Sequence, residues 1–165
     1  MELISESARL TSIKPWIRET RTTETRVLNI LLVEDDAVDV MNVERAFSKN
    51  HITNPLFVAG DGIEALRKLR GDEIPRDRRL VLLDLSLPRM NGIEFLGELR
   101  RDPDLASIPV VVLTTSTDDQ DRFDAYNLNV AGYLLKPVTF SGFCDLMTAM
   151  NKYWAVVEMP MEAGD

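Results

Sequence analysis

The stretch "ILLVEDDAVD", residues 30–39, joins an apolar run to a cluster of acids. The four apolar residues at its start are typical of a short buried strand. Three carboxylates follow directly, those of Glu34, Asp35 and Asp36. Like charges repel one another, so a partly buried cluster of this kind requires a compensating cation. The stretch therefore predicts a strand that ends at a cation-binding edge.

Further along the chain, short apolar segments alternate with segments that have helical spacing. The apolar segments lie at 27–33, 54–60, 80–85, 108–115 and 132–137, and the helical ones at 37–50, 61–70, 92–101, 118–129 and 140–154. The first, third and fourth apolar segments are apolar almost throughout, as parallel strands covered on both faces are. The alternation predicts an α/β fold with a parallel sheet.

The composition excludes several classes of function. The formal net charge of −8 argues against binding to nucleic acid or to an anionic membrane surface, because both favour Lys and Arg. The single cysteine, Cys144, excludes an intramolecular disulfide, and no apolar run approaches the roughly 20 residues that span a bilayer. We therefore expect a cytoplasmic protein that binds neither nucleic acid nor membrane.

The composition changes clearly once, near Arg26, where the polar segment "RETRTTETR" gives way to periodic sequence. A chain of 165 residues readily buries one core but hardly two. We therefore expect an N-terminal extension at 1–26, one domain at 27–155 and a C-terminal tail at 156–165.

Functional groups follow several of the predicted strands. In an open parallel sheet such groups gather beyond the carboxyl ends of the strands. Asp84 ends one strand, Thr114 another and Lys136 a third. Carboxylates in this number suit Mg²⁺, which prefers one or two carboxylates together with waters and phosphate oxygens. The set predicts that Asp84 attacks a phosphoryl group whose charge Lys136 and the metal neutralise, while Thr114 donates a hydrogen bond to it.

Four blocks in order, "LLVEDD", "LVLLDLSLPRMNG", "VVVLTTS" and "GYLLKP", resemble the signature of the receiver domain of two-component response regulators. The resemblance covers nearly everything except the N-terminal extension. It implies a flavodoxin-like (βα)5 fold, a doubly wound parallel sheet with strand order 2-1-3-4-5. It also implies a phosphoacceptor signalling protein, not an enzyme, that is phosphorylated by a sensor histidine kinase and acts by phosphotransfer or protein contact.

The same resemblance implies roles for individual residues. Asp84 is the implied phosphoacceptor, and Glu34 and Asp35 are the acidic pair. Mg²⁺ is implied to bind Asp35, Asp84 and the backbone carbonyl of Ser86, in a metal site that includes Glu34. One departure from the family pattern is that Glu34 replaces the commoner aspartate.

The last two blocks supply the implied switch. Thr114 is the switch hydroxyl, Lys136 pairs with the phosphate, Tyr133 is the switch aromatic and Pro137 follows a cis peptide bond. By this resemblance, phosphorylation pulls Thr114 toward the phosphate, lets Tyr133 turn inward and changes the surface around it. Thr115 stands where a small alanine is usual, and we expect it to tighten access to the acyl phosphate.

Three further segments, "LTTS", "FDAYNLNVAGYLLKP" and "NKYW", resemble single-domain regulators paired with phytochrome-type photoreceptor kinases. This resemblance implies a phytochrome-type sensor histidine kinase as the partner. A histidine phosphotransfer protein is a further candidate partner, which would take the phosphoryl group onward.

Two other classes of function are weighed against this one. A phosphatase of the haloacid dehalogenase type also uses a strand-end aspartate with Mg²⁺, but it carries a second aspartate two residues later, where this chain has Ser86. A degenerate receiver that acts only as a protein-binding module would typically have lost the phosphoacceptor or the lysine. Asp84 and Lys136 are both present.

Several residues also have purely structural interpretations. Asp36 is expected to cap the first helix, and Tyr133 is equally well explained as a packed strand residue. His51 is expected to be a solvated loop residue. Cys144, Met147 and Met150 are expected to pack in the core or in an interface.

A homodimer is predicted from the two ends of the chain. The last helical segment carries more large apolar groups than one core-facing stripe readily hides, and it continues into the apolar tail "AVVEMPM". These groups are Phe140, Phe143, Met147, Met150, Tyr153 and Trp154. The extension adds Leu3, Ile4, Leu10, Ile13, Trp16 and Ile17, which we expect to pack on the domain or to reach the partner.

Overall fold

Five parallel strands form one sheet in the order β2-β1-β3-β4-β5. The computed structural model describes residues 27–160. The strands are β1 (Asn29–Val33), β2 (Leu56–Ala59), β3 (Arg79–Leu83), β4 (Val110–Thr114) and β5 (Gly132–Leu135). The helices are α2 (Ala37–Lys49), α3 (Gly62–Arg70), α4 (Gly92–Arg101), α5 (Asp119–Asn127) and α6 (Phe140–Val156). The predicted α/β fold and its strand order are confirmed.

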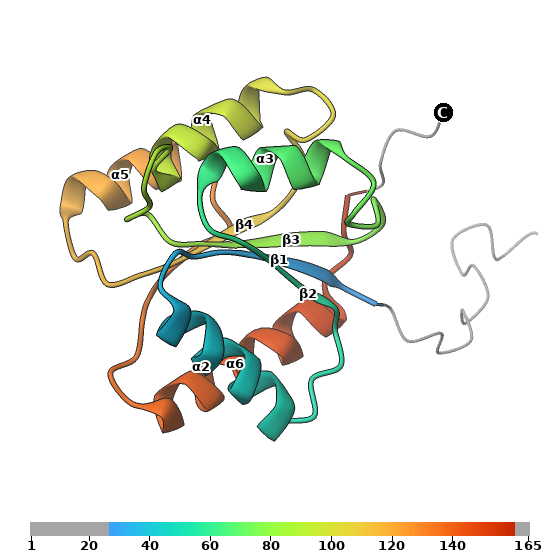
Figure 1. Cartoon of the computed structure of the whole chain (residues 1–165), viewed down its shortest axis with the longest axis vertical. Helices are drawn as coiled ribbons and strands as arrows, with labels where there is room; N and C mark the ends of the chain where they lie inside the picture. The colour runs from blue at the N-terminus through green and yellow to red at the C-terminus, as the bar shows by residue number, and fades with distance from the viewer. Residues whose placement is uncertain (1–26, 161–165) are drawn as a thin grey trace, which may run out of the picture.

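The helices form a layer on each face of the sheet (Figure 1): α3, α4 and α5 cover one face, and α2 and α6 cover the other. Each layer encloses its own apolar core. Phe95 and Leu99 of α4 lie in the first core, and Phe143 and Met147 of α6 lie in the second. Every residue of β1, β3 and β4 is buried, because these strands are covered on both faces.

Each helix begins at a side chain that accepts hydrogen bonds from the first backbone amides. Asp36 accepts from the amides of Val38 and Asp39, as the sequence predicted. The corresponding residues at the starts of α3, α4, α5 and α6 are Asp61, Asn91, Asp118 and Thr139. These caps fix the point at which each chain segment turns from the sheet into a helix.

The register of the strands sets the position of the residues that follow them. Val33 of β1 lies opposite Leu83 of β3, and Thr114 of β4 lies opposite Leu135 of β5. Glu34 follows β1, Asp84 follows β3 and Lys136 follows β5. The parallel register therefore brings these side chains to the same edge of the sheet, which we call the carboxyl edge.

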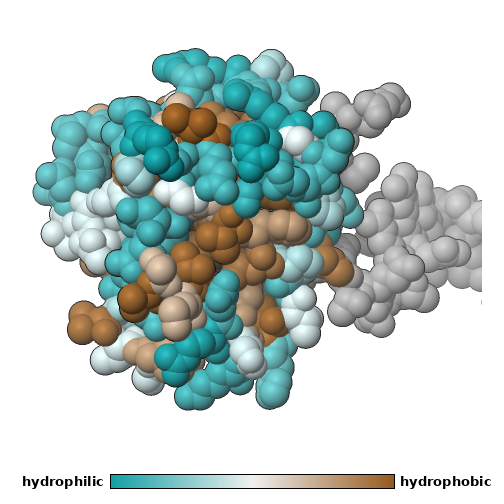
Figure 2. All heavy atoms as spheres, viewed as in Figure 1, coloured by the Kyte–Doolittle hydropathy of each residue, from teal (hydrophilic) through white to brown (hydrophobic). Residues whose placement is uncertain are grey.

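Strand β2 forms an outer edge of the sheet and is less covered than the inner strands. Leu56, Phe57 and Val58 are all partly exposed. Figure 2 shows hydrophobic residues gathered in a band across the middle of this face, at the level where β2 runs in Figure 1. Strand β1, by contrast, is buried along its whole length.

Helix α6 hides much of its apolar surface inside its own domain. Phe143, Met147 and Trp154 are buried, and Val157 and Met159 of the following segment pack against the same core. Tyr153 and Val156 remain exposed, at 60% and 79%. The apolar surplus that the sequence suggested is therefore smaller than expected.

The Lys136–Pro137 peptide bond is trans, so the implied cis bond is wrong; the bond before a proline still favours trans. Residues 1–26 and the end of the tail from 161 lie outside the described residues. No helix between residues 27 and 160 is both long and apolar enough to cross a membrane.

Candidate functional site

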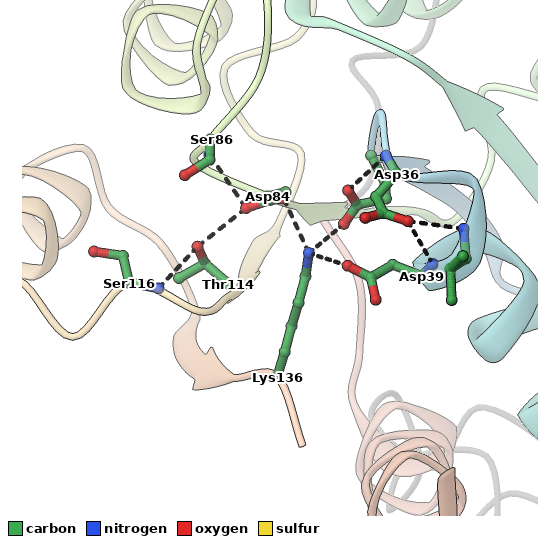
Figure 3. A network of polar contacts seen from close by, with 9 residues as sticks. Asp36, Asp39, Asp84, Ser86, Thr114, Ser116 and Lys136 are labelled. Atoms are coloured by element: carbon green, nitrogen blue, oxygen red, sulfur yellow. Dashed lines mark hydrogen bonds and ion pairs between the residues drawn. The ribbon is translucent and has the colours of Figure 1, made fainter. Parts of the chain in front are cut away.

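The side chain of Asp84 lies at the centre of the carboxyl edge and is almost fully buried. Its Oδ1 accepts hydrogen bonds from the Thr114 hydroxyl at 3.0 Å and from the Ser86 amide at 3.2 Å. Its Oδ2 accepts from Lys136 Nζ at 3.0 Å. Both carboxylate oxygens are thus held in fixed directions by groups from three different segments (Figure 3).

Lys136 reaches this carboxylate from the end of β5 (Figure 3). Its ammonium also donates to Glu34 Oε2 at 2.5 Å and to Asp39 Oδ2 at 2.7 Å. Burial acts to lower the pKa of Lys136, but the hydrogen bonds to Asp39, Glu34 and Asp84 outweigh it, so its pKa is raised. The lysine therefore remains charged at every physiological pH.

Glu34 is the most deeply buried acid of the opening cluster, with 4% of its surface exposed. Burial raises the pKa of Glu34 to about 7, although the hydrogen bonds from Lys136 and from the Asp36 amide oppose the shift. The amide of Asp36 donates to Glu34 Oε1 at 3.0 Å. Lys136 carries one positive charge but faces three carboxylates, so it does not compensate all of their negative charge.

The carboxylates of Glu34, Asp35 and Asp84 each offer an oxygen, and these oxygens lie within 4.8 Å of one another. Asp35 is exposed, so the group opens to solvent on one side. Hard oxygen ligands from two or three carboxylates suit a divalent cation such as Mg²⁺ or Mn²⁺. The donor set and its excess of negative charge therefore fit a bound divalent cation.

Thr114 and Tyr133 do not touch in the described contacts, but both bind Ser116. The Ser116 amide donates to Thr114 Oγ1 at 3.3 Å, and the Tyr133 hydroxyl donates to the Ser116 carbonyl at 3.0 Å. Ser116 Oγ in turn donates to Asp121 of α5 at 2.6 Å. One residue of the β4–α5 loop thus connects the carboxyl edge to the face formed by α5 and β5.

The loop at 86–91, between β3 and α4, is fixed beside Asp84. A Cβ atom added at Gly92 would lie 2.6 Å from the Asp84 carbonyl oxygen, and the Gly92 amide donates to the Leu85 carbonyl at 3.0 Å. On the other side of the loop, Arg89 forms an ion pair with the buried Asp61 at the start of α3. Close backbone packing and this ion pair together fix where Ser86 lies.

The structure brings together five of the predicted site residues: Glu34, Asp35, Asp84, Thr114 and Lys136. Ser86 lies beside them, and Tyr133 is joined to them through Ser116. Sequence reasoning missed Asp39 and Ser116. Asp39 lies in the first turn of α2 and Ser116 in the β4–α5 loop, and no pattern in the sequence marks either residue.

Comparison with known proteins identifies what this arrangement resembles. Residues 30–148 match the family described as the response regulator receiver domain. The chain is 42% identical over 130 residues to the probable methanogenesis regulatory protein FilR2 of Methanothrix harundinacea, covering 76% of this chain and 82% of that protein. It is 36% identical over 129 residues to response regulator Rcp1 of Synechocystis, covering 76% and 87%.

Solved structures give the same result. The phosphorylated cyanobacterial phytochrome response regulator RcpA superimposes with a TM-score of 0.73 at 34% identity, over 82% of this chain and 99% of that chain. The Mn²⁺-bound form of Rcp1 superimposes with a TM-score of 0.71 at 36% identity, over 81% and 99%.

Proposed function

The chain belongs to the response regulator receiver domain family, and from this premise we propose that Asp84 accepts a phosphoryl group from a sensor histidine kinase. The observation that carries the proposal is the environment of the Asp84 carboxylate. The Lys136 ammonium and the Thr114 hydroxyl both donate to it at 3.0 Å. Donors that already point at this carboxylate are suited to stabilise charge on a phosphoryl group transferred to it.

In the proposed reaction, an Asp84 oxygen forms a bond to phosphorus while the bond from phosphorus to the kinase histidine breaks. The electron pair of the broken bond stays on the histidine nitrogen. Lys136 donates to the carboxylate before transfer and to a phosphoryl oxygen after it, and Thr114 donates to a second phosphoryl oxygen. A divalent cation, when bound, supplies the remaining positive charge.

The proposed cation is Mg²⁺, held by Asp35, Asp84 and the Ser86 carbonyl in a site that includes Glu34. The group of three carboxylate oxygens supports this assignment. The relative Rcp1 has been solved with Mn²⁺ bound, and Mn²⁺ shares the preference of Mg²⁺ for oxygen ligands. Labelling by a phosphodonor should accordingly stop in excess chelator and return when Mg²⁺ is restored.

The decisive experiment compares the parent with Asp84→Asn after incubation with Mg²⁺ and a small acyl phosphate. Intact-mass measurement should show one added phosphoryl group on the parent and none on the variant. Circular dichroism should show that the variant is folded, because asparagine is nearly the same size. Equal labelling of the two proteins would refute Asp84 as the acceptor.

The same assay separates the alternatives. A phosphatase of the haloacid dehalogenase type would hydrolyse a small phosphomonoester continuously, whereas the proposed signalling protein is labelled once and shows no steady turnover of it. A degenerate receiver would not be labelled at all. We therefore propose that the protein is not an enzyme with an external product.

The proposed output is a change in the surface formed by α5, β5 and α6. Ser116 supports this route, because its amide binds Thr114 and its carbonyl binds Tyr133. If Thr114 moves to the phosphoryl group, this contact changes and Tyr133 can turn inward. A crystal structure with beryllofluoride should show both side chains displaced, and unchanged positions would contradict the route.

The proposed kinase is a phytochrome-type photoreceptor. The similarity to the phytochrome response regulator RcpA supports it, whereas the similarity to FilR2 points to another kind of regulation. Phosphotransfer rates from a phytochrome-type kinase and from an unrelated histidine kinase would decide between them. Onward transfer to a histidine phosphotransfer protein is tested by adding that protein to the labelled chain.

We further propose a homodimer that pairs α6 and the tail across a two-fold axis. The exposed Tyr153 and Val156 on the last turns of α6 support it. Light scattering at micromolar concentration should give twice the monomer mass, and a monomer both with and without phosphorylation would contradict it. The proposed location is the cytoplasm, because the single cysteine excludes an intramolecular disulfide.

A further inference from the structure

The ammonium of Lys136 has three hydrogen atoms and three carboxylate partners. These are Glu34 at 2.5 Å, Asp39 at 2.7 Å and Asp84 at 3.0 Å. The two partners other than Asp84 come from different segments: Glu34 follows β1, and Asp39 lies in the first turn of α2. Figure 3 shows the lysine directed toward Asp84 with the Asp39 carboxylate beside its ammonium.

A lysine side chain has four flexible carbon atoms, so its position depends on what holds its charged end. Only 7% of the Lys136 side chain is exposed, compared with 25% of the Asp39 side chain. The ion pair between them is therefore largely shielded from water, which makes it stronger than a pair on the open surface. Asp39 itself is held by the Asp36 carboxylate, which accepts from its amide.

We propose that Asp39 is a positioning residue for phosphoryl transfer, which holds the Lys136 ammonium at the Asp84 carboxylate. This inference rests on the proposed function. When Asp84 is phosphorylated, a phosphoryl oxygen replaces one partner of the lysine, and the bonds to Glu34 and Asp39 keep the other two donors in place. The ammonium is then oriented before the transfer begins and needs no reorganisation during it.

The role of Asp39 is distinct from that of the metal site. The described group of possible metal ligands contains Glu34, Asp35 and Asp84 and does not contain Asp39. Asp39 contacts Lys136, which as a cation cannot bind the metal. Replacing Asp39 should therefore slow phosphoryl transfer without changing the concentration of Mg²⁺ at which half-maximal labelling occurs.

Asp36 provides a matched control in the same turn. It carries the same charge and lies three residues earlier, and in the described contacts its carboxylate accepts only from the amides of Val38 and Asp39. Asparagine caps helices about as well as aspartate, so Asp36→Asn removes the charge and keeps the cap. Asp39→Asn also removes one charge, but it weakens the contact with Lys136.

The first measurement is the initial rate of labelling by a small acyl phosphate at saturating Mg²⁺. Asp39→Asn should be labelled about three- to tenfold more slowly than the parent, because one charge-assisted hydrogen bond is weakened while two remain. Asp36→Asn should be labelled at nearly the parental rate. Equal rates for Asp39→Asn and the parent, equal slowing of both variants, or a shifted Mg²⁺ midpoint for Asp39→Asn would overturn the inference.

The second measurement reports on the lysine directly. The rate at which an amine-reactive acetylating reagent modifies Lys136, followed by peptide mass spectrometry, should rise several-fold in Asp39→Asn and stay unchanged in Asp36→Asn. Unchanged reactivity in Asp39→Asn would overturn the inference. If the parent itself is not labelled, the proposed function fails, and the reactivity of Lys136 still tests the contact with Asp39.

Discussion

Charged side chains have different kinds of partner at the two ends of the sheet. At the carboxyl edge, buried acids face one another and share a single lysine, Lys136. At the amino end of the strands, which we call the amino edge, a buried and a half-buried arginine donate to neutral backbone carbonyls. Arg79, the first residue of β3, donates to the carbonyls of Leu69, Ile74 and Pro75 at 2.7 to 3.0 Å.

A second arginine repeats this arrangement beside β4 and β5. Arg100 of α4 donates to the carbonyls of Ala106, Ile108, Leu128 and Asn129, at 2.8 to 3.1 Å. Each of these arginines ties a loop at the amino edge to the domain. Carbonyls satisfy these donors without adding charge, so these contacts require no bound ion.

The charged groups at the amino edge stabilise the fold, whereas those at the carboxyl edge are suited to bind a cation. At the amino edge, Arg79 and Arg100 are paired with carbonyls and stabilise the loops, whereas Nε and Nη2 of the neighbouring Arg78 are buried without a hydrogen bond in the described residues. The carboxyl edge carries more negative charge than its lysine compensates, and the resulting repulsion destabilises the fold when no cation is bound. Substitutions at the two edges should therefore change the free energy of unfolding in opposite directions.

The largest effect is expected at the amino edge. Arg79→Met should lower the free energy of unfolding by about 3 kcal/mol, because three buried carbonyls lose their donors. Urea denaturation measures this directly. Arg70→Met is the control, since within residues 27–160 the ion pair of Arg70 is a solvent-exposed one with Asp102, and its loss should cost less than about 1 kcal/mol. Equal losses for the two variants would show that the buried hydrogen bonds of Arg79 stabilise the fold no more than an exposed ion pair does.

An intermediate effect is expected from pH at the carboxyl edge. Burial raises the pKa of Glu34 to about 7, above its ordinary value of 4.5. Between these values the folded metal-free protein keeps a proton that the unfolded chain has lost, so rising pH destabilises the metal-free fold and favours cation binding. From about pH 6 to about pH 8, the apparent affinity for Mg²⁺ should rise about tenfold.

The matched variant for this experiment is Glu34→Gln, which cannot ionise. Isothermal titration of Mg²⁺ into the parent and the variant at several pH values gives the comparison. The variant should bind more weakly throughout and show a much flatter pH dependence. A parent as insensitive to pH as the variant would exclude Glu34 as the titrating group.

The smallest effect is expected for Asp35→Ala. In chelator, this change should raise the free energy of unfolding by about 0.5 kcal/mol, because it relieves repulsion among the acids. In excess Mg²⁺ the order should reverse, because the parent is stabilised by the bound cation and the variant is not. Thermal unfolding with and without Mg²⁺ measures both signs, with Asp104→Ala, an exposed acid elsewhere, as a control that should change in neither condition.

The sequence predicted the fold well because the signals for it are local. The apolar runs of β1, β3 and β4 are nearly continuous, and an acid or amide precedes most of the helices as a cap. The end of α6 was harder to predict, because Val157 and Met159 pack on their own core, and this contact depends on the folded shape.

Sequence reasoning brought together the candidate site residues that lie at the ends of strands. Glu34, Asp84, Thr114 and Lys136 each follow or end a strand, so topology alone brings them together. Asp39 reaches the site from inside a helix, and Ser116 contributes mainly backbone atoms, so neither residue type marks a role in the sequence. The buried pairing of Arg79 was also invisible, because its partners are carbonyls that any residue carries.

The glycine that begins α4 has a consequence for the evolution of the chain. Because an added Cβ at Gly92 would lie 2.6 Å from a backbone atom of Asp84, every other amino acid would displace Asp84, the proposed phosphoacceptor, or the helix. Gly97 in the same helix meets only the flexible Arg101 side chain, at 3.8 Å, so alanine should be accepted there. In a saturation-mutagenesis library selected for signalling, position 92 should stay glycine while position 97 drifts, so that a residue with no functional group is as constrained as the aspartate it touches.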